Sequence, residues 1–204
     1  MIIRLEEEKD WREVENLTRE AFWNKYRPGC CEHYVLHRYR HNPDFVKELD
    51  YVIEEKGRII AHIMYSRAAI KNTDGKDIPV MTFGPVSVLP ELQGRGYGGR
   101  LISFSMSGAA DLGCPLIAIL GDPDYYSRFG FVSGNSVKVY YAGAPRGEEF
   151  PYFLVKELRS GFLNEIKGGV YSDPSGYSVD QDALKEFDRC FPPKEMKKLP
   201  GQLG

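Results

Sequence analysis

Apolar residues along the chain follow two different spacings, and each spacing predicts one kind of element. In the middle of the chain, Leu101, Phe104 and Leu112 recur at helical intervals, which predicts an amphipathic helix over residues 97–112. The apolar residues that follow run without interruption over 115–120, and such a run is typical of a short buried strand. The middle of the chain therefore predicts a helix and then a strand.

The first forty residues carry weaker versions of the same signals. Residues 1–5 predict a first strand. Asp10 with Glu13 three positions later forms a capping-box pattern, which predicts the start of a helix. A second helix is predicted over residues 31–41. The first helix has an apolar face at helical spacing, made by Val14, Leu17 and Ala21.

A hairpin and a long strand are predicted next. Residues 51–55 and 58–70 have strand character and flank Lys56-Gly57, which fits a tight turn. A second turn is predicted at 72–76, and residues 78–89 form the strand that leads into the middle of the chain.

The last third of the chain predicts an addition to this core. We expect one domain over residues 1–142 and a C-terminal extension over 143–204 that packs on the same core, with a loop at 143–149. Residues 152–157 predict a strand and residues 180–189 a helix. The aromatic residues of this extension predict either a layer over the site where a substrate binds or a contact in a homodimer.

Composition narrows the class of protein. A chain of 204 residues, 42% of them hydrophobic, can bury one substantial core. The net charge of −2 gives no general attraction to nucleic acid or to acidic membranes, so neither is expected as a partner. Charged residues in the first ten positions argue against a signal peptide, and no apolar run is long enough to span a membrane. The four cysteines form no disulfide pattern, which favours a reducing compartment, the cytoplasm.

The chemistry is concentrated in residues 86–99, where a strand ends and a glycine-rich turn leads into the start of a helix. Glycines let consecutive N–H groups converge, and the helix N-terminus adds its positive dipole end. The tract therefore predicts a phosphate-binding loop.

Two common phosphate-binding motifs fit this tract poorly. Gly94, Gly96 and Gly99 match G-x-G-x-x-G, but nearly half the chain precedes them, whereas a dinucleotide fold opens with that motif. The Lys-Ser or Lys-Thr pair of a P-loop is also missing. The better match is Gln-x-x-Gly-x-Gly at Gln93, Gly96 and Gly98.

That pattern resembles the acyl-CoA-binding motif of the GNAT N-acetyltransferases. The resemblance implies an α/β (α+β) fold, the GNAT acyl-CoA N-acyltransferase fold, with a central mixed, mostly antiparallel sheet flanked by helices. It implies acetyl-CoA as cosubstrate, held by the pyrophosphate at the turn and by pantetheine beside the preceding strand. The expected cofactor-binding residues are Val86, Ser87, Val88, Gln93, Gly94, Arg95, Gly96, Tyr97, Gly98, Gly99 and Arg100.

The segment after the 115–120 strand extends the resemblance. Tyr-x-x-x-Gly-Phe is similar to the family's helix after its fifth strand, where a tyrosine is often assigned as the general acid that protonates the leaving thiolate. By spacing, that residue is Tyr126, and Tyr125 packs against the core, although both tyrosines could be core residues. Many members carry an Asn after the fifth strand that contacts pantetheine. This chain has Gly121-Asp122-Pro123 instead, which puts that contact in doubt.

The chain also resembles, more narrowly, a group of uncharacterised predicted acetyltransferases. Two segments carry that resemblance, Tyr-Arg-Pro-Gly-Cys at 26–30 and Gly-Asp-Pro-x-Tyr-Tyr at 121–126. It names no substrate.

Three histidines at 33, 37 and 41 suggest another kind of site, because His at i and i+4 is a workable zinc spacing. The third histidine lies another turn along the helix and would not converge on the same ion, so we expect no metal. The alternatives are contact with substrate or a solvated basic face. That face would comprise His33, His37, Arg38, Arg40 and His41.

The expected reaction is transfer of an acetyl group from acetyl-CoA to a primary amine of a small molecule or peptide. A backbone N–H near Val88 would stabilise the oxyanion, and Tyr126 would supply the proton to the thiolate. The general base stays open among Asp122, Glu32, His33 and His62. Two other classes compete, a non-catalytic acyl-CoA-binding module and a nucleotide-binding regulatory or oxidoreductase domain.

Overall fold

The structure contains the hairpin that was predicted at Lys56-Gly57. The structure is a computed structural model that describes residues 1–144 and 148–202. Strand β2 (Tyr51–Glu55) pairs antiparallel with β3 (Arg58–Lys71), and β1 (Ile2–Leu5) pairs with the other edge of β2. Lys56 and Gly57 both have positive φ, at 54° and 75°, as a type I′ hairpin turn requires.

Together with these three strands, the other described strands form one mixed sheet that is mostly antiparallel, as predicted. Strand order is β1-β2-β3-β4-β5-β8-β6, and β9 pairs with both β3 and β7. Two of the described pairs are parallel, β4 with β5 at Met81↔Ile117 and β7 with β9, whereas β5·β8, β6·β8 and β3·β9 are antiparallel. The bounds of these strands are β4 Asp77–Val88, β5 Leu116–Leu120, β6 Val132–Ser133, β7 Tyr140–Tyr141, β8 Phe153–Glu157 and β9 Val170–Tyr171.

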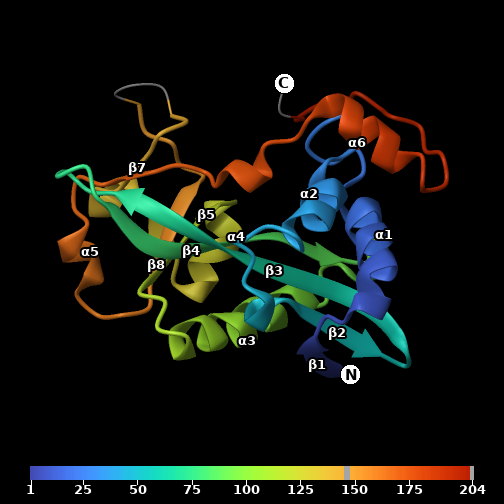
Figure 1. Cartoon of the computed structure of the whole chain (residues 1–204), viewed down its shortest axis with the longest axis horizontal. Helices are drawn as coiled ribbons and strands as arrows, with labels where there is room; N and C mark the ends of the chain where they lie inside the picture. The colour runs from blue at the N-terminus through green and yellow to red at the C-terminus, as the bar shows by residue number, and fades with distance from the viewer. Residues whose placement is uncertain (145–147, 203–204) are drawn as a thin grey trace. The chain divides into compact units, whose positions relative to one another are not determined.

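In the described chain, two helices stand between the first two strands, and single helices follow four of the later strands (Figure 1). Their bounds are α1 Trp11–Phe22, α2 Glu32–Tyr39, α3 Tyr97–Asp111, α4 Pro123–Tyr126, α5 Phe162–Glu165 and α6 Gln181–Asp188. Helix α2 contacts both α1 and α6. Among the described residues, no helix combines the length and the hydrophobicity needed to cross a membrane.

Most predicted elements are found within two residues of their expected ends. Strand β9 and helix α5 were not predicted, because two to four residues carry no readable periodicity. Within the predicted loop at 143–149, Pro145–Gly147 lie outside the described residues.

The chain divides into two compact units. Unit 1 comprises Met1–Met64, Pro85–Ile102 and Ser175–Gly204, and unit 2 comprises Tyr65–Gly84 and Ser103–Pro174. Each buries its own apolar residues. The core of unit 1 includes Leu17, Leu36, Val52, Ile53 and Ile63, and that of unit 2 includes Ile70, Leu116, Ala118, Phe153, Val155 and Tyr171.

The predicted capping box at Asp10 is wrong. Asp10 makes no side-chain cap to α1, because its carboxylate accepts hydrogen bonds from Arg4 at 2.6 Å and from the Glu7 backbone at 2.9 Å. The capping box forms one turn earlier, between Glu7 and Asp10, around a single 3-10 turn at Glu8–Asp10. An arginine from β1 therefore draws Asp10 away from the helix that its spacing indicated.

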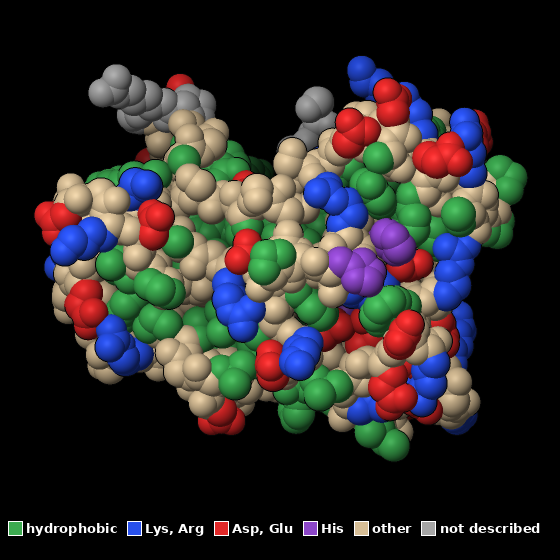
Figure 2. All heavy atoms as spheres, in the orientation of Figure 1, with side chains coloured by type: hydrophobic (Ala, Val, Ile, Leu, Met, Phe, Trp, Pro, Cys, Tyr) green, Lys and Arg blue, Asp and Glu red, His purple; other side chains and the backbone are tan. Residues whose placement is uncertain are grey.

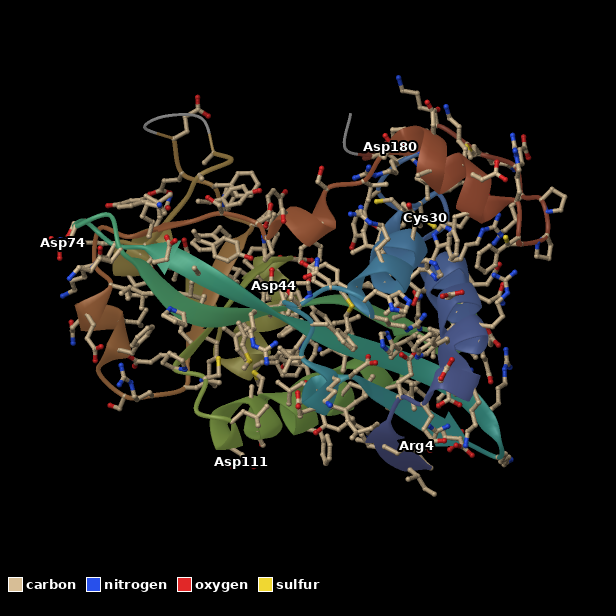
Figure 3. The ribbon with its side chains drawn as sticks, in the orientation of Figure 1. Arg4, Cys30, Asp44, Asp74, Asp111 and Asp180 are labelled. Atoms are coloured by element: carbon tan, nitrogen blue, oxygen red, sulfur yellow. The ribbon has the colours of Figure 1, made fainter. Side chains whose placement is uncertain are left out.

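A buried ion pair attaches helix α6 to α1 and α2 within unit 1. Arg19 donates from Nε to Asp188 Oδ1 at 2.6 Å and from Nη2 to Oδ2 at 3.0 Å, and its side chain is only 1% exposed. His33 Nε2 lies 3.1 Å from the same Oδ1, and the Cys30 thiol lies 3.4 Å from His33 Nδ1. Figure 3 labels Cys30 at this place, and Asp180 at the start of α6. One carboxylate thus joins three elements.

The segment after α6 continues along the loop between α1 and α2. The Trp23 indole and the Asn24 side-chain amide both donate to the Glu195 carbonyl at 3.0 Å. The Asn24 side-chain oxygen accepts from the backbone N–H groups of Gly29 and Lys197, at 2.8 and 3.0 Å. Asn24 has a positive φ of 60° and connects the two segments.

Asp188→Asn should destabilise the protein by about 3–5 kcal/mol, because the Arg19 guanidinium would stay buried without a counter-charge. Urea unfolding measures the change. Glu186→Gln on the same helix is the control: its pair with Arg189 is more than 70% exposed on both sides, so the change there should be within about 0.5 kcal/mol. Equal effects of the two variants would contradict a buried role for Asp188.

His33 gives the protein a pH-dependent stability with a definite sign. Burial lowers the pKa of His33 to about 4, despite the nearby Asp188 carboxylate, whereas an unfolded histidine titrates near 6.5. Between those values the unfolded chain binds more protons than the folded one, so stability falls as pH falls from about 6.5 to 4.

His33→Gln should remove that contribution, which is up to about 3 kcal/mol across the window. The difference in unfolding free energy between wild type and variant should shrink steadily from pH 7 to pH 4. His41→Gln, which changes an exposed ring, is the control. A difference that stays constant with pH would show that folding does not lower the pKa of His33.

Candidate functional site

The chain turns from β4 into α3 through two glycines in the left-handed region. Strand β4 ends at Val88, a 3-10 turn follows at Pro90–Leu92, and α3 begins at Tyr97. Gly94 has φ +75° and Gly96 has φ +87°, and residues that carry a Cβ rarely adopt such values. The Arg100 N–H donates to the Gly96 carbonyl at 3.0 Å, which is the first bond of the helix.

The outer side of this turn is open. A Cβ atom placed on Gly94 or on Gly96 would meet no other atom within 4 Å. The first N–H groups of α3 have no acceptor inside the helix, and they carry its positive dipole end. The turn therefore has the space and the donors that a phosphate group requires.

Two predicted cofactor-binding residues use their side chains for hydrogen bonds within unit 1. Gln93 donates from Nε2 to the Val88 carbonyl at 3.0 Å, so it fixes the turn against the end of β4. Ser87 is fully buried and donates to the Thr18 hydroxyl on α1 at 2.9 Å. A ligand beside β4 could use the backbone of Ser87 but not its hydroxyl.

The other predicted residues of this tract surround the turn. Val86 and Val88 are half-buried, and Arg95 is exposed. The Tyr97 hydroxyl lies 3.5 Å from Glu55 Oε2, and Arg100 Nη1 lies 3.2 Å from the sulfur of Met1. Gly98 is buried and Gly99 half-buried in the first turn of α3. The structure thus brings 86–88 and 93–100 together at one strand-to-helix junction.

Tyr126 lies in unit 2, at the end of α4, half-buried. Asp122 caps this helix by accepting from the Asp124 N–H at 2.9 Å, and the Tyr126 N–H donates to the Asp122 carbonyl at 3.0 Å. The Tyr126 ring packs against Phe131 and Phe83, with centroids 5.6 and 6.0 Å apart. The phenol is held by rings from β4 and from the segment after α4.

Tyr125 has a different environment. The Arg128 guanidinium lies 4.6 Å above its ring, and burial raises the pKa of its hydroxyl. Its ring meets that of Tyr126 edge-on, at 5.0 Å between centroids.

The four candidates for the general base are all engaged in the structure. Asp122 caps α4, and Glu32 accepts from the Cys31 N–H at 2.9 Å. His33 belongs to the cluster around Asp188, and His62 Nε2 lies 2.7 Å from Asp50 Oδ1 with no exposed surface. No candidate is favoured by its geometry.

The predicted solvated basic face on α2 is wrong in two positions. His33 is fully buried, and the Arg40 side chain is 1% exposed, donating to Glu6 at 2.7 and 2.9 Å and to Glu15 at 2.7 Å. His37 is partly exposed and bonds Glu15 at 2.9 Å, whereas His41 lies at the surface against Trp11. Figure 2 shows imidazole groups at the surface over α2. The three histidines therefore face different partners.

One buried polar cluster was missed by sequence reasoning. Ligand-type atoms of Glu6, Asp50 and His62 lie within 4.8 Å of one another. Burial raises the pKa of Glu6 to about 7 and of Asp50 to about 6, and lowers that of His62 to about 4. Both Glu6 oxygens accept from Arg40, so an arginine supplies the positive charge that a metal ion would otherwise bring. The arrangement is an ion-pair network.

No local pattern could have revealed this cluster or the Arg19–Asp188 pair. Glu6 and Arg40 are 34 residues apart, and Arg19 and Asp188 are 169 apart, on elements whose packing has no signature in either segment.

The chain is similar to a known family over most of its length. The profile described as "Acetyltransferase (GNAT) domain" matches residues 2–133. The uncharacterised N-acetyltransferase YjhQ of Escherichia coli is 38% identical over 95 residues, which are 46% of this chain and 51% of YjhQ, so that match spans about half of the relative. The uncharacterised N-acetyltransferase YhbS of E. coli is 25% identical over 172 residues, 83% of this chain and 95% of YhbS.

Solved structures agree on the fold. The crystal structure of YhbS in complex with CoA has a TM-score of 0.72 at 23% identity, covering 86% of this chain and 91% of that one. A GNAT family acetyltransferase from Brucella melitensis, in complex with acetyl-CoA, has a TM-score of 0.68 at 26% identity, covering 87% and 97%. Because the family profile spans well over half of the chain and the GNAT fold is found, the chain belongs to the GNAT family of acetyltransferases and is an acyltransferase.

Proposed function

We propose that this protein transfers the acetyl group of acetyl-CoA to a primary amine of a small molecule or peptide. The observation that carries the proposal is the β4–α3 turn, where two left-handed glycines leave open space at the start of α3. The first N–H groups of a helix have no acceptor within it. The relatives crystallised with CoA and with acetyl-CoA support the choice of cosubstrate.

In this proposal the turn at 93–100 holds the pyrophosphate of CoA through backbone N–H groups. Exposed Arg95 and Arg100 add a salt-sensitive attraction to its phosphates. The pantetheine arm runs beside Val86–Val88 as an added strand, with the backbone as its partner. This assignment uses the backbone of Ser87, because its hydroxyl is bound to Thr18.

The chemistry follows from the groups involved. A neutral amine attacks the thioester carbonyl carbon, the carbonyl becomes an oxyanion, and a backbone N–H near Val88 stabilises that charge. The attacking nitrogen loses one proton to solvent, the carbon–sulfur bond breaks, and an amide and a thiolate remain. We assign Tyr126 as the general acid that gives its phenolic proton to the thiolate, and a phenol of ordinary pKa near 10 is protonated at neutral pH.

Gly96→Ala should weaken acetyl-CoA binding about tenfold or more, because the new Cβ occupies the open space of the turn and strains a left-handed position. Isothermal titration calorimetry measures the affinity. Gly75→Ala is a matched control: Gly75 has φ +79° and equally open surroundings, in the β3–β4 turn. Both variants should lose similar stability, but only Gly96→Ala should lose affinity. Unchanged affinity in folded Gly96→Ala would refute the phosphate-binding assignment.

Tyr126→Phe should lower kcat about 10²-fold, the usual contribution of general acid catalysis, because the ring stays and the proton is lost. Acetyl-CoA affinity should change little, and Tyr125→Phe should be close to neutral. The assay is release of the CoA thiol with an amine found by screening acceptors. Near-normal turnover of Tyr126→Phe would end the general-acid role. If no amine supports thiol release, the non-catalytic acyl-CoA-binding module becomes the better description.

A further inference from the structure

Gly121, directly after β5, lies against the ring of Tyr126. A Cβ built on Gly121 would lie 2.4 Å from Cε2, 2.6 Å from Cδ2 and 3.4 Å from Cζ of that ring. Real Cβ atoms essentially never come closer than 3.0 Å to a neighbour. The backbone of Gly121 is not in the left-handed region, so its conformation would accept alanine. Only the ring excludes a side chain here.

Neither partner of this contact can easily move away. The Gly121 N–H donates to the Tyr152 carbonyl at 2.8 Å, which holds its backbone beside the start of β8. On its other sides the Tyr126 ring meets Tyr125, Phe131 and Phe83, with centroids 5.0, 5.6 and 6.0 Å away. Close packing of this kind transmits a local change in volume to the ring.

We propose that Gly121 is a positioning residue for Tyr126: the missing side chain leaves room for the Cδ2–Cε2 side of the ring after β5 and so sets the place of its hydroxyl. The proposal rests on the assignment of Tyr126 as general acid. It also accounts for the departure from the family's Asn at this point of the chain, because any side chain would enter the volume that the ring occupies. Displacing a catalytic group by about 1 Å lowers rates strongly.

The test is Gly121→Ala in the full chain, with Tyr126→Phe and the double variant beside it. Protein labelled with ¹³C at tyrosine Cζ gives one signal per tyrosine, and the signal lost in Tyr126→Phe identifies Tyr126. Gly121→Ala should shift that signal and lower kcat at least tenfold, while acetyl-CoA affinity stays within about twofold. In the double variant the two losses in kcat should not multiply, because both act through one hydroxyl.

Gly176→Ala is the matched control, since its Cβ would lie 2.5 Å from Cζ of Tyr39, a buried tyrosine in unit 1. It should lower stability without moving the Tyr126 signal or kcat. If Gly121→Ala does not fold, its cost in stability is measured in a Tyr126→Ala background, where the ring is gone and the added methyl should cost nothing. A cost that persists there would overturn the proposal.

An unshifted Tyr126 signal in folded Gly121→Ala, or losses in kcat that multiply, would also overturn it. The proposed function can fail separately. If Tyr126→Phe keeps normal kcat, the general-acid assignment is lost, and the Tyr126 signal alone then decides whether Gly121 sets the place of the ring.

Discussion

Two left-handed glycines decide where the chain goes after β4. Gly94 and Gly96 supply the left-handed backbone that the chain adopts between the end of β4 and the first turn of α3. Any other residue would bring a Cβ into an unfavourable conformation and into the open side of the turn. Gln93 supports the same geometry, since its side-chain amide donates to the last carbonyl of β4. The cofactor binding that we propose for this turn therefore depends mainly on the backbone.

Unit 1 also buries two arginine side chains. The side chains of Arg19 and Arg40 are 1% exposed, and each is balanced by carboxylates from other segments. Buried ion pairs add little net stability, because desolvation offsets most of the attraction, but breaking one leaves an unpaired charge at high cost. They act here by specifying partners: α6 docks where Arg19 lies, and α2 docks where Glu6 and Glu15 lie. An apolar contact has no preferred direction, so the same helices could pack in more than one register.

The elements that were predicted correctly are those whose formation depends on residues close together in the sequence. The hairpin at Lys56-Gly57, the helix after the glycine turn and the strand after it all have local signatures, and all were found. Predictions failed where a residue outside the local pattern bonds a side chain. Arg4 takes Asp10 from its expected cap, and Asp188 makes His33 an internal residue. At the candidate site the pattern predicted the glycine turn between a strand and a helix, which was found, but it could not show that Ser87 is bound to Thr18 or that the ring of Tyr126 lies against Gly121.

The Arg19–Asp188 pair has a consequence for how the protein is made. A ribosome releases the chain from its N-terminus, so α1 and α2 emerge long before the carboxylate that neutralises Arg19, which lies 169 residues further on. Until residue 188 has left the exit tunnel, the Arg19 guanidinium stays hydrated. The face of α1 and α2 on which α6 packs then stays exposed to solvent. The first helices of the chain are thus among the last to reach their final environment, and nascent chains shorter than this present an unfinished surface to chaperones and proteases.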